Sequence, residues 1–483
     1  MAEPAQDHPS VQDSLRQVVE LLRRHQLVKS LVERQEMPRH QLVESLVHKQ
    51  NLAELQTKLD KLHPADVAYV LEALPLAERL AVWDLVKADR DGDILLEVSD
   101  AVRETLIAHM ETKELVAATE QLDTDEIADL APDLPREVMQ DVFRSLSVEE
   151  RDQLRAAMSY PEDTVGGLMD FDMITVRDDI TVDVVLRYLR RLDEMPDHTD
   201  QIFVVDRQEH LRGLLSVSRL LVSDLDAPVI AIMTAATVKL APDENAQDAA
   251  LAFERYDLVS APVVDGDEKL IGRVTVNSVV DFIREETDSE KLSAGGLREE
   301  EDLFASVWSS VKNRWTWLAI NLVTAFIASR VIGIFEGSIE KIVALAALMP
   351  IVAGIGGNSG NQTITMIVRA LALGQITVAS ARKLFAKEIG VSFINGLIWG
   401  SVVGLFAFFI YHNWQLGLVM TGAMVLNLLL AAVMGVTVPL LMHKLGRDPA
   451  VGSSVMITAI TDSGGFFIFL GLATLFLVHP AGA

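Results

Sequence analysis

Five long apolar stretches in the C-terminal part constrain this chain more than any other feature. They cover residues 315–335, 341–372, 387–411, 415–442 and 453–478. A helix crosses a hydrocarbon core ~30 Å thick with about 20 residues, so each stretch is long enough to span a bilayer. The sequence therefore predicts a transmembrane domain of five helices over residues 311–483, and it excludes an all-soluble protein.

The formal net charge of −27 is divided unevenly along the chain. Residues 311–483 carry a net charge of +5, whereas the first 310 residues carry −32. The acidic and the apolar parts are therefore separate domains, and no nucleic-acid partner is expected. The chain contains no cysteine, which excludes a disulfide scaffold, thiolate metal sites and cysteine nucleophiles.

The charges in the loops between the apolar stretches predict the orientation in the membrane. The second loop contains Arg382, Lys383 and Lys387, and the fourth contains His443, Lys444 and Arg447. The connection at 411–414 and the tail after residue 477 contain neither lysine nor arginine. Short loops rich in these residues stay in the cytosol, and residues 1–10 lack the apolar core of a signal peptide. We expect a multi-pass protein of the plasma (inner) membrane, with a cytosolic N-terminus and an extracytoplasmic C-terminus.

The first 158 residues show only helical patterns. Residues 1–60 contain two similar amphipathic stretches, 26–35 and 41–50, and packing against a neighbouring helix explains them best. Residues 61–158 contain a repeat, because 62–75 and 122–135 match and both end in Leu-Pro. Proline stops one helix and suits the start of the next. The sequence predicts an all-α superhelical domain here.

Residues 159–278 alternate short strands and helices, and the order recurs after about sixty residues. Strand-like 173–176, helical 182–192 and strand-like 201–206 and 211–218 are followed by 238–240, 246–256, 261–265 and 270–276 in the same roles. This duplication resembles an α/β tandem pair of CBS domains, and another βαβ fold is the alternative. Residues 279–310 then predict an acidic connecting helix, whose charges could equally be a solvated face.

Polar residues interrupt the second apolar stretch between Pro350 and Gln362. Irregular or closely packed backbone at membrane depth lies inside protein or along a water-filled path. Glycine-mediated helix packing would explain the glycines but not the amides. The candidates for lining a pore are Gly356, Gly357, Asn358, Asn361 and Gln362.

Asp462 is the only carboxylate predicted well inside an apolar stretch. A central aspartate costs roughly 3 kcal/mol to insert, and such residues normally face a cavity, an ion or a partner. No cationic side chain at similar depth offers an obvious partner. A cation pathway is favoured over the alternative, a protonated or hydroxyl-bonded structural aspartate.

The order of domains, the run Gly356–Gln362, the segment Arg447–Ala450 and Asp462 together resemble the MgtE family of magnesium channels and transporters. The resemblance covers nearly the whole chain. It implies a homodimer whose pore lies between the subunits, with Asp462 of each meeting a hydrated Mg²⁺. Mg²⁺ prefers oxygen ligands and sheds water reluctantly, which fits carboxylates and amides. The resemblance also makes Asp448 a metal candidate, and it places Glu336 and Glu340 at the outer mouth, where interfacial solvation explains them equally well.

The same resemblance implies that cytosolic Mg²⁺ closes the pore by binding between the helical domain, the CBS pair and the connecting helix. The positions that match this regulatory set are Asp125, Asp129, Asp257, Asp281, Glu286 and Asp288. Asn245 and Ser278 stand where the family often has acids, so some of these sites are expected to be weak. Adenine-nucleotide binding by the CBS pair is left open, because no motif decides it.

These features predict a Mg²⁺-selective channel that imports Mg²⁺ down its electrochemical gradient and is gated by cytosolic Mg²⁺. The alternative is a carrier coupled to H⁺ or Na⁺, and Co²⁺, Mn²⁺ or Ni²⁺ are alternative cargo. A membrane sensor with purely anchoring helices is disfavoured, because an anchor needs neither the polar run nor Asp462. An enzyme is not expected, since the sequence shows no nucleophile–base pair and no Walker loop.

Overall fold

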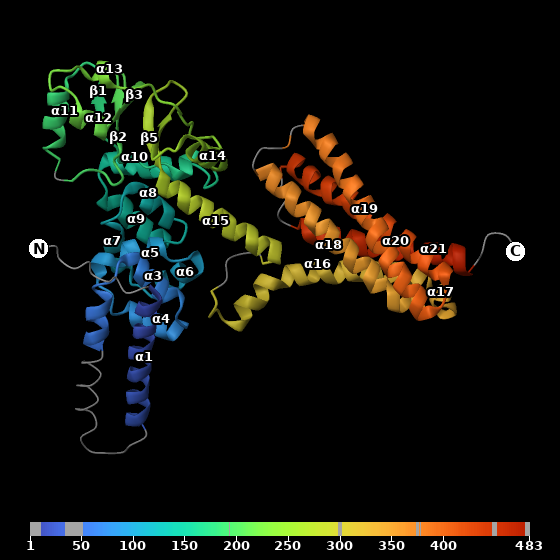
Figure 1. Cartoon of the computed structure of the whole chain (residues 1–483). Coiled ribbons are helices and arrows are strands. Elements are labelled where there is room, and N and C mark those ends of the chain that lie inside the picture. Colours follow the sequence, from blue (N-terminus) through green and yellow to red (C-terminus); the bar gives the residue numbers. More distant parts are fainter. Residues whose placement is uncertain are drawn as a thin grey trace, which may run out of the picture. The chain divides into compact units, whose positions relative to one another are not determined.

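The computed structural model describes residues 11–33, 52–192, 194–297, 302–372, 376, 378–446 and 452–478. The chain forms two compact units (Figure 1). The first contains Met1–Thr287 and Glu300–Ala305, and the second contains Asp288–Glu299 and Ser306–Ala483. Most of the sequence repeat at 26–35 and 41–50, and the segment Arg447–Ala450 with Asp448, lie outside the described residues.

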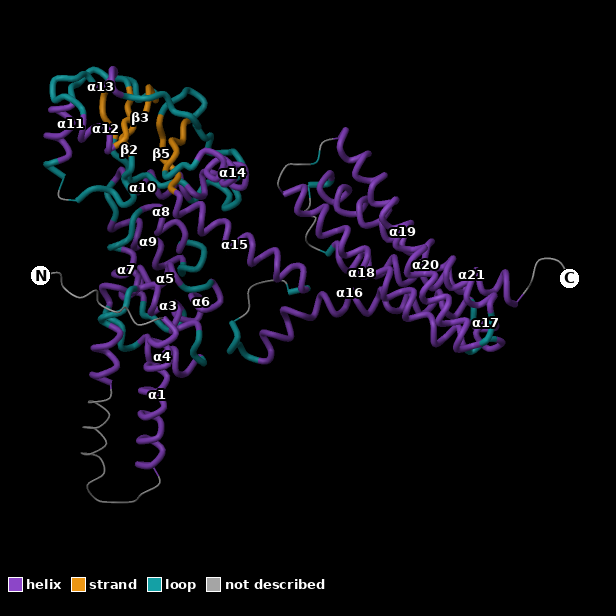
Figure 2. Tube along the Cα trace, viewed as in Figure 1, coloured by secondary structure: helices purple, strands orange, loops and turns teal. Residues whose placement is uncertain are grey.

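The N-terminal part of the first unit is entirely helical (Figure 2). Its helices are α1 (Val11–Glu33), residues 52–59, α3 (Pro64–Glu72), α4 (Leu76–Trp83), α5 (Asp91–Glu97), α6 (Asp100–Ile107), α7 (Thr112–Thr119), α8 (Thr124–Leu130), α9 (Arg136–Ser145) and α10 (Val148–Ala157). The two Leu-Pro signals are correct, because Pro75 and Pro135 directly precede α4 and α9. Leu71, Leu106 and Leu154 belong to one buried core, so this part is a single helical domain.

The α/β part follows as two related halves. The first contains β1 (Thr175–Arg177), α11 (Val182–Leu189), β2 (Gln201–Val205), β3 (Leu211–Ser216) and α12 (Val217–Val222). The second contains α13 (Val229–Ile232), α14 (Ala246–Tyr256), β4 (Ser260–Val264) and β5 (Leu270–Thr275). In the first half β1 pairs with β2 in parallel and β2 pairs with β3 antiparallel. The second half repeats the antiparallel pair as β4 and β5.

The pairing registers confirm the predicted duplication in detail. Gln201 pairs with Ser216 in the first half, and Ser260 pairs with Thr275 in the second. Both hairpins also carry a register shift near the end of their first strand, after Val204 and after Val263. The predicted strand at 238–240 is wrong: it forms one parallel bridge, from Leu240 to Val263, because only this residue reaches the neighbouring strand.

One long helix leads out of the α/β part toward the membrane helices. The helix α15 (Val276–Gly295) begins directly after β5, three residues before the predicted start. Its first part belongs to the first unit and its last part to the second. The described residues 302–305 belong to the first unit again, before α16 begins.

The second unit contains five long helices and one short helix, and long apolar sequences explain most of them. They are α16 (Val307–Ile334), the short α17 (Glu336–Lys341), α18 (Ala344–Ala372), α19 (Val378–Tyr411), α20 (Trp414–Lys444) and α21 (Ser453–Ala473). Four helical segments are long and apolar enough to cross a membrane: 307–334, 380–411, 414–444 and 453–478. The helix α18 is long enough but carries the polar run, and it continues as regular helix through Pro350 and the glycines. Among the described residues, a long helix therefore lies at each of the five predicted stretches, and four of these helices have the composition of a membrane span.

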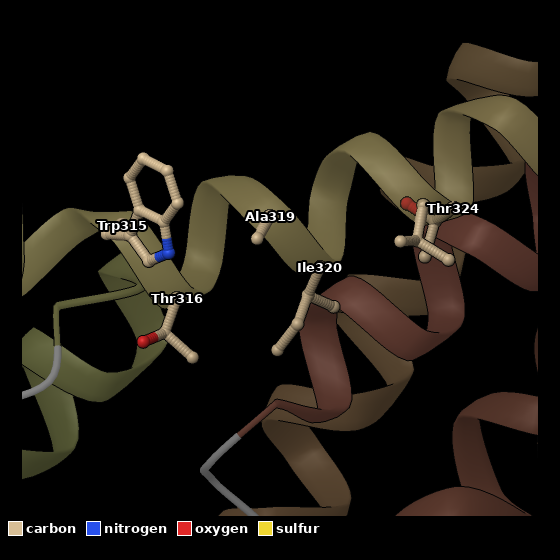
Figure 3. A pocket seen from close by; sticks show the side chains of 6 residues that line it. Trp315, Thr316, Ala319, Ile320 and Thr324 are labelled. Carbon is tan, nitrogen blue, oxygen red and sulfur yellow. The ribbon is translucent and has the colours of Figure 1, made fainter.

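The helices of this unit differ in how far they are covered. The central helix α20 packs against α18, α19 and α21, and half of its most apolar segment is buried. Only 6% of the corresponding segment of α16 is buried. Figure 3 shows a shallow hollow beside α16 that Trp315, Ile320 and Thr324 line. Its lining comes from one helix and contains no charged residue, so it has the character of a lipid-facing surface.

Candidate functional site

The glycine run of α18 packs closely against α20 and α21. A Cβ atom added to Gly356 would lie 2.2 Å from Nδ2 of Asn427 on α20, and one added to Gly465 of α21 would lie 2.7 Å from the same atom. The Asn427 side chain is fully buried between these glycines and donates a 2.8 Å hydrogen bond to the carbonyl oxygen of Val352. Gly356 therefore serves a three-helix contact, and sequence patterns did not single out Asn427.

Polar atoms without a protein partner lie inside this bundle. Oδ1 of Asn361, Oδ1 of Asn427 and Oγ of Ser463 are buried and have no hydrogen-bond partner among the described residues. Leaving such an atom unpaired costs about 1–3 kcal/mol. Two other predicted pore residues, Asn358 and Gln362, are exposed on the single chain. The helices α18, α20 and α21 thus carry unpaired oxygen atoms that would accept hydrogen bonds from a water molecule or from the hydration shell of a cation.

Asp462 lies on α21 and is half-buried. No ion pair or hydrogen bond links its carboxylate to another residue in the part of the chain that the structure describes. Its neighbour Thr461 is fully buried, donates to the carbonyl oxygen of Ile457 at 2.8 Å, and faces Gly357 of the polar run. The helix with the deep carboxylate and the helix with the polar run therefore pack against each other next to Asp462.

A second buried carboxylate in the membrane unit was missed from the sequence. The Glu388 side chain on α19 accepts a hydrogen bond of 3.2 Å from Oγ1 of Thr363 on α18, and Nζ of Lys387 lies 3.3 Å from its other oxygen. The predicted start of this span at residue 387 made Glu388 look terminal. Since α19 begins at Val378, Glu388 lies ten residues inside the helix.

The predicted acids at the outer mouth lie on the short helix α17. Glu336 and Glu340 are both exposed there. A 2.7 Å hydrogen bond between Ser338 of α17 and Thr474 fixes this helix to the end of α21. The two glutamates are therefore held on an ordered element of the membrane unit, and no described residue forms an ion pair with either of them.

The strongest electrostatic feature of the first unit surrounds α8. Burial, with a further contribution from the charge of Asp170, raises the pKa of Asp125 to about 8. Burial also raises the pKa of Asp129 to about 7, although Arg103 opposes the shift. Asp129 keeps contact with solvent, but the surrounding protein withdraws enough water to disfavour its charge. Both predicted regulatory acids of the helical domain are thus held in an environment that resists ionisation.

The residues that face α8 from the α/β part were not predicted. Asp170 is buried, and burial raises its pKa even though Nη2 of Arg273 lies 2.7 Å from its carboxylate. Arg273 also donates to the carbonyl oxygen of Asp197 at 2.8 Å. Asp170 and Arg273 are 103 residues apart in the sequence, so local patterns could not have paired them. We name the group Asp123, Asp125, Glu126, Asp129, Glu162, Asp170, Asp172, Asp197 and Glu285 the acidic junction.

The connecting helix joins this group through Glu285, whose charge raises the pKa of Asp129. The predicted residues Asp281 and Glu286 lie on the same helix and are exposed. Asp288, further along α15, forms a 2.8 Å ion pair with Lys291. Asp257 is also exposed and ends α14 with a left-handed backbone (φ 51°).

The two positions where acids were expected have structural roles instead. Asn245 caps α14 by accepting a hydrogen bond from the backbone of Gln247, and the Ser278 hydroxyl is hydrogen-bonded to Thr275. Within the described ranges, no three acidic or histidine side chains converge closely enough to hold a metal ion. The acidic junction is therefore a charged surface shared by three elements rather than a finished coordination cage.

Models of known families match most of the chain. The MgtE intracellular N domain matches residues 62–163, the CBS domain matches 165–226 and 229–285, and the divalent cation transporter family MgtE matches 349–472. The boundaries agree with the helical domain, the duplicated α/β part and the membrane helices from α18 onward.

Curated relatives extend this similarity along the chain. The magnesium transporter MgtE of Thermus thermophilus is 31% identical over 88% of this chain and 95% of its own length. The magnesium transporter MgtE of Bacillus subtilis is 25% identical over 88% and 94% of the two chains. Among solved structures, the cytosolic domain of the Mg²⁺ channel MgtE in complex with ATP is 28% identical, with a TM-score of 0.45, and covers 50% of this chain and 98% of that domain. These relatives are transporters rather than enzymes, and the chain belongs to the MgtE family of magnesium transporters.

Proposed function

We propose that this protein is a Mg²⁺-selective channel that imports Mg²⁺ down its electrochemical gradient and is gated by cytosolic Mg²⁺. Membership of a magnesium transporter family supports the cargo. The apolar helices α16, α19, α20 and α21 support a location in the plasma (inner) membrane. The loop charges support a cytosolic N-terminus and an extracytoplasmic C-terminus.

The ion pathway is proposed to run past Asp462 and the polar run of α18. Mg²⁺ sheds its water reluctantly, so a pathway of one carboxylate and several neutral oxygens can hold the hydrated ion without stripping it. The partner-free oxygens of Asn361, Asn427 and Ser463 support this assignment, because they offer the kind of ligand that bound water needs. Asp462 from two subunits of a homodimer would double the negative charge at one point of the pathway.

The acidic junction is the observation that carries the proposed gating. Its carboxylates resist ionisation, as the raised pKa values of Asp125 and Asp129 record. A divalent cation placed among them relieves the same repulsion that protons relieve. Binding through the hydration shell suits the absence of a three-ligand cluster among the described residues. Mg²⁺ would thus favour the packed arrangement of the helical domain, the CBS pair and the first part of α15.

The test is ion flux in proteoliposomes that contain the full-length protein. With Mg²⁺ raised only on the side of the soluble part, influx from the other side should fall, and the membrane potential should drive it steeply. A requirement for a proton or sodium gradient would favour the coupled carrier instead. Flux of Co²⁺, Mn²⁺ or Ni²⁺ without Mg²⁺ flux would refute the proposed cargo. An adenine nucleotide is a second candidate ligand of the CBS pair, and titration calorimetry with ATP tests it separately.

A further inference from the structure

The helical domain contains a fully buried arginine whose carboxylate partner comes from a distant part of the chain. Arg79 lies on α4 and is 0% exposed. Its Nε donates to the carbonyl oxygen of Leu71 at 2.8 Å, and Nη2 donates to that of Leu74 at 3.1 Å. These carbonyls lie at the end of the preceding helix α3 and just beyond it, where further donors help to satisfy the backbone oxygens. Arg79 therefore caps the end of α3, and the other edge of its guanidinium group points away from that helix.

The outward edge of the guanidinium group binds Asp302 with two parallel hydrogen bonds. Nη1 donates to Oδ2 at 2.7 Å and Nη2 donates to Oδ1 at 3.0 Å. The Asp302 side chain is only 7% exposed. Burial alone would raise the pKa of Asp302, but the hydrogen bonds from Arg79 bring it below its usual value. Two parallel bonds between a guanidinium group and a carboxylate are both strong and specific in geometry.

The position of Asp302 in the chain gives this ion pair its importance. Val307, the first residue of the apolar helix α16, follows five positions later. The segment between them is itself ordered, because Oδ1 of Asp302 accepts from the backbone of Phe304 and Ser306 caps α16. Five residues span at most about 18 Å when fully extended. While the ion pair holds, the start of α16 cannot move further than this from Asp302.

The pair also differs from the ion pairs on the protein surface. Exposed pairs such as Lys87–Asp60 are screened by water and salt and contribute little to the stability of the fold. Separation of Arg79 from Asp302 would leave a buried cation without its counter-charge, which is strongly unfavourable. A displacement of the helical domain would therefore carry residue 302 along before it broke the pair.

We propose that the helical domain acts directly on the first membrane helix through the Arg79–Asp302 pair, in parallel with the connecting helix α15. This inference rests on the proposed gating by cytosolic Mg²⁺. It assigns to the helical domain a docking site for the segment that precedes α16, with Asp302 as the anchoring side chain. A Mg²⁺-dependent movement of the helical domain then reaches α16 even if α15 does not transmit it.

The first experiment measures the docking itself in the full-length protein. The chain has no cysteine, so Leu303→Cys gives a single site for a nitroxide label, and this side chain is 89% exposed. The label should be slowly mobile in the parent and clearly more mobile after Asp302→Asn. Asparagine can still accept the hydrogen bond from Phe304, so the change removes the charge and keeps the turn. Asp60→Asn, which breaks an exposed pair in the helical domain, is the matched control and should leave the label unchanged.

The second experiment measures transport with the same variants in proteoliposomes. Asp302→Asn should shift the cytosolic Mg²⁺ concentration for half-inhibition by about fivefold or more, the usual scale of coupling between sites. Arg79→Gln should shift it in the same direction, and the double variant should equal the larger single effect, because both act through one contact. Arg90→Gln is the matched control, since Arg90 also binds carbonyl oxygens of the helical domain, those of Leu59 and Leu62. It should leave the inhibition unchanged.

Three outcomes overturn the proposal. An equally slow label after Asp302→Asn would show that the pair does not dock the segment. A mobile label with unchanged Mg²⁺ inhibition would show that the docked segment transmits nothing to α16. Additive shifts in the double variant would show that the two residues act separately. A parent protein without any Mg²⁺ inhibition would instead refute the gating proposal, and the label would still report whether the segment docks. The double variant carries no unpaired buried charge, so it also guards against misfolding of the single variants.

Discussion

The acidic junction and the membrane bundle supply oxygen ligands in opposite ways. Around α8 the chain gathers carboxylates from the helical domain, the CBS pair and α15, and burial together with their mutual repulsion raises the pKa of Asp129 to about 7 and that of Asp125 to about 8. In the bundle of α18, α20 and α21 the spare oxygens are mostly neutral, and Asp462 stands alone among the described residues.

This difference fits two different tasks for one ion. A gate needs a large change in free energy between its cation-free and cation-bound states, and crowded acids supply that change. A pathway needs an ion to leave as readily as it enters, and a single carboxylate with neutral oxygens binds weakly enough for that.

Asp462→Asn should have the largest effect, because it removes the only charge assigned to the pathway. We expect Mg²⁺ flux, or the preference for Mg²⁺ over Ca²⁺, to fall roughly tenfold, which corresponds to about 1.4 kcal/mol. Flux and competition assays in proteoliposomes measure it. Asp462→Glu should retain part of the selectivity. Thr437→Val, which removes a hydroxyl bonded only to its own helix, is the control. Normal flux in Asp462→Asn would remove this carboxylate from the pathway.

Gly356→Ala should destabilise the membrane bundle by about 1–3 kcal/mol, the usual cost of overpacking. The new methyl group would meet the Asn427 amide, which is held between two glycines. Gly354→Ala is the matched control, because nothing lies within 4 Å of its added Cβ. Thermal unfolding of the purified protein should separate the two variants. Equal unfolding temperatures would mean that the polar run tolerates volume and does not depend on close contact.

These glycines illustrate which features of the membrane bundle the sequence could predict and which it could not. Composition predicted that the run 350–362 is unusual, and the structure shows that one face of it, with Gly356, Gly357 and Gly360, packs inside the bundle. Sequence could not say which glycine meets which helix, because that depends on the rotation of α18 about its axis. Asn427 escaped attention for the same reason: an amide in an apolar helix becomes informative only when its neighbours are known.

The first unit shows the same limit for residues that are far apart in the sequence. The duplication of the CBS pair was visible because related strands recur at a constant separation. Asp125 and Asp129 came from resemblance alone, and nothing near them in the sequence indicates pKa values of about 8 and 7. Those shifts arise first from burial, with a further contribution from Asp170 at Asp125 and from Glu126 and Glu285 at Asp129. The sequence therefore could not predict these pKa shifts, because they depend on how distant parts of the chain pack together.

Lowering the pH should stabilise the packed state of the acidic junction in the same way as bound Mg²⁺. A carboxyl group with a higher pKa in the packed state binds more protons there, so the packed state gains stability as the pH falls below about 8. The gain is up to about 1.4 kcal/mol per pH unit for each proton taken up. Without Mg²⁺, the soluble part of the full-length protein should resist protease better at pH 6 than at pH 8. Asp125→Asn with Asp129→Asn should flatten this dependence, and Asp152→Asn, an exposed control, should not. An unchanged pH profile in the double variant would place the titrating groups elsewhere.

The smallest effect is expected from the exposed acids of α15. The side chains of Asp281, Glu286 and Asp288 are exposed, although partial burial raises the pKa of Asp281, and Asp288 already pairs with Lys291. Exposed pairs contribute about 0–1 kcal/mol each, because water and salt screen them. Their joint replacement by Asn or Gln should therefore shift the Mg²⁺ dependence of protease protection less than the change at Asp125 and Asp129.

Charge repulsion within the acidic junction is strong only where the protein excludes water. Two unit charges 4 Å apart interact by about 4 kcal/mol at an effective dielectric near 20, but by about 1 kcal/mol in bulk water. The α15 triple variant is therefore the more solvent-accessible counterpart of Asp125 and Asp129 on α8. The dependence of protease protection on Mg²⁺ should weaken partly in the triple variant and almost completely in the α8 variant. If the triple variant has the larger effect, the exposed face of α15 binds the regulatory ion itself, and burial does not set the strength of the gate.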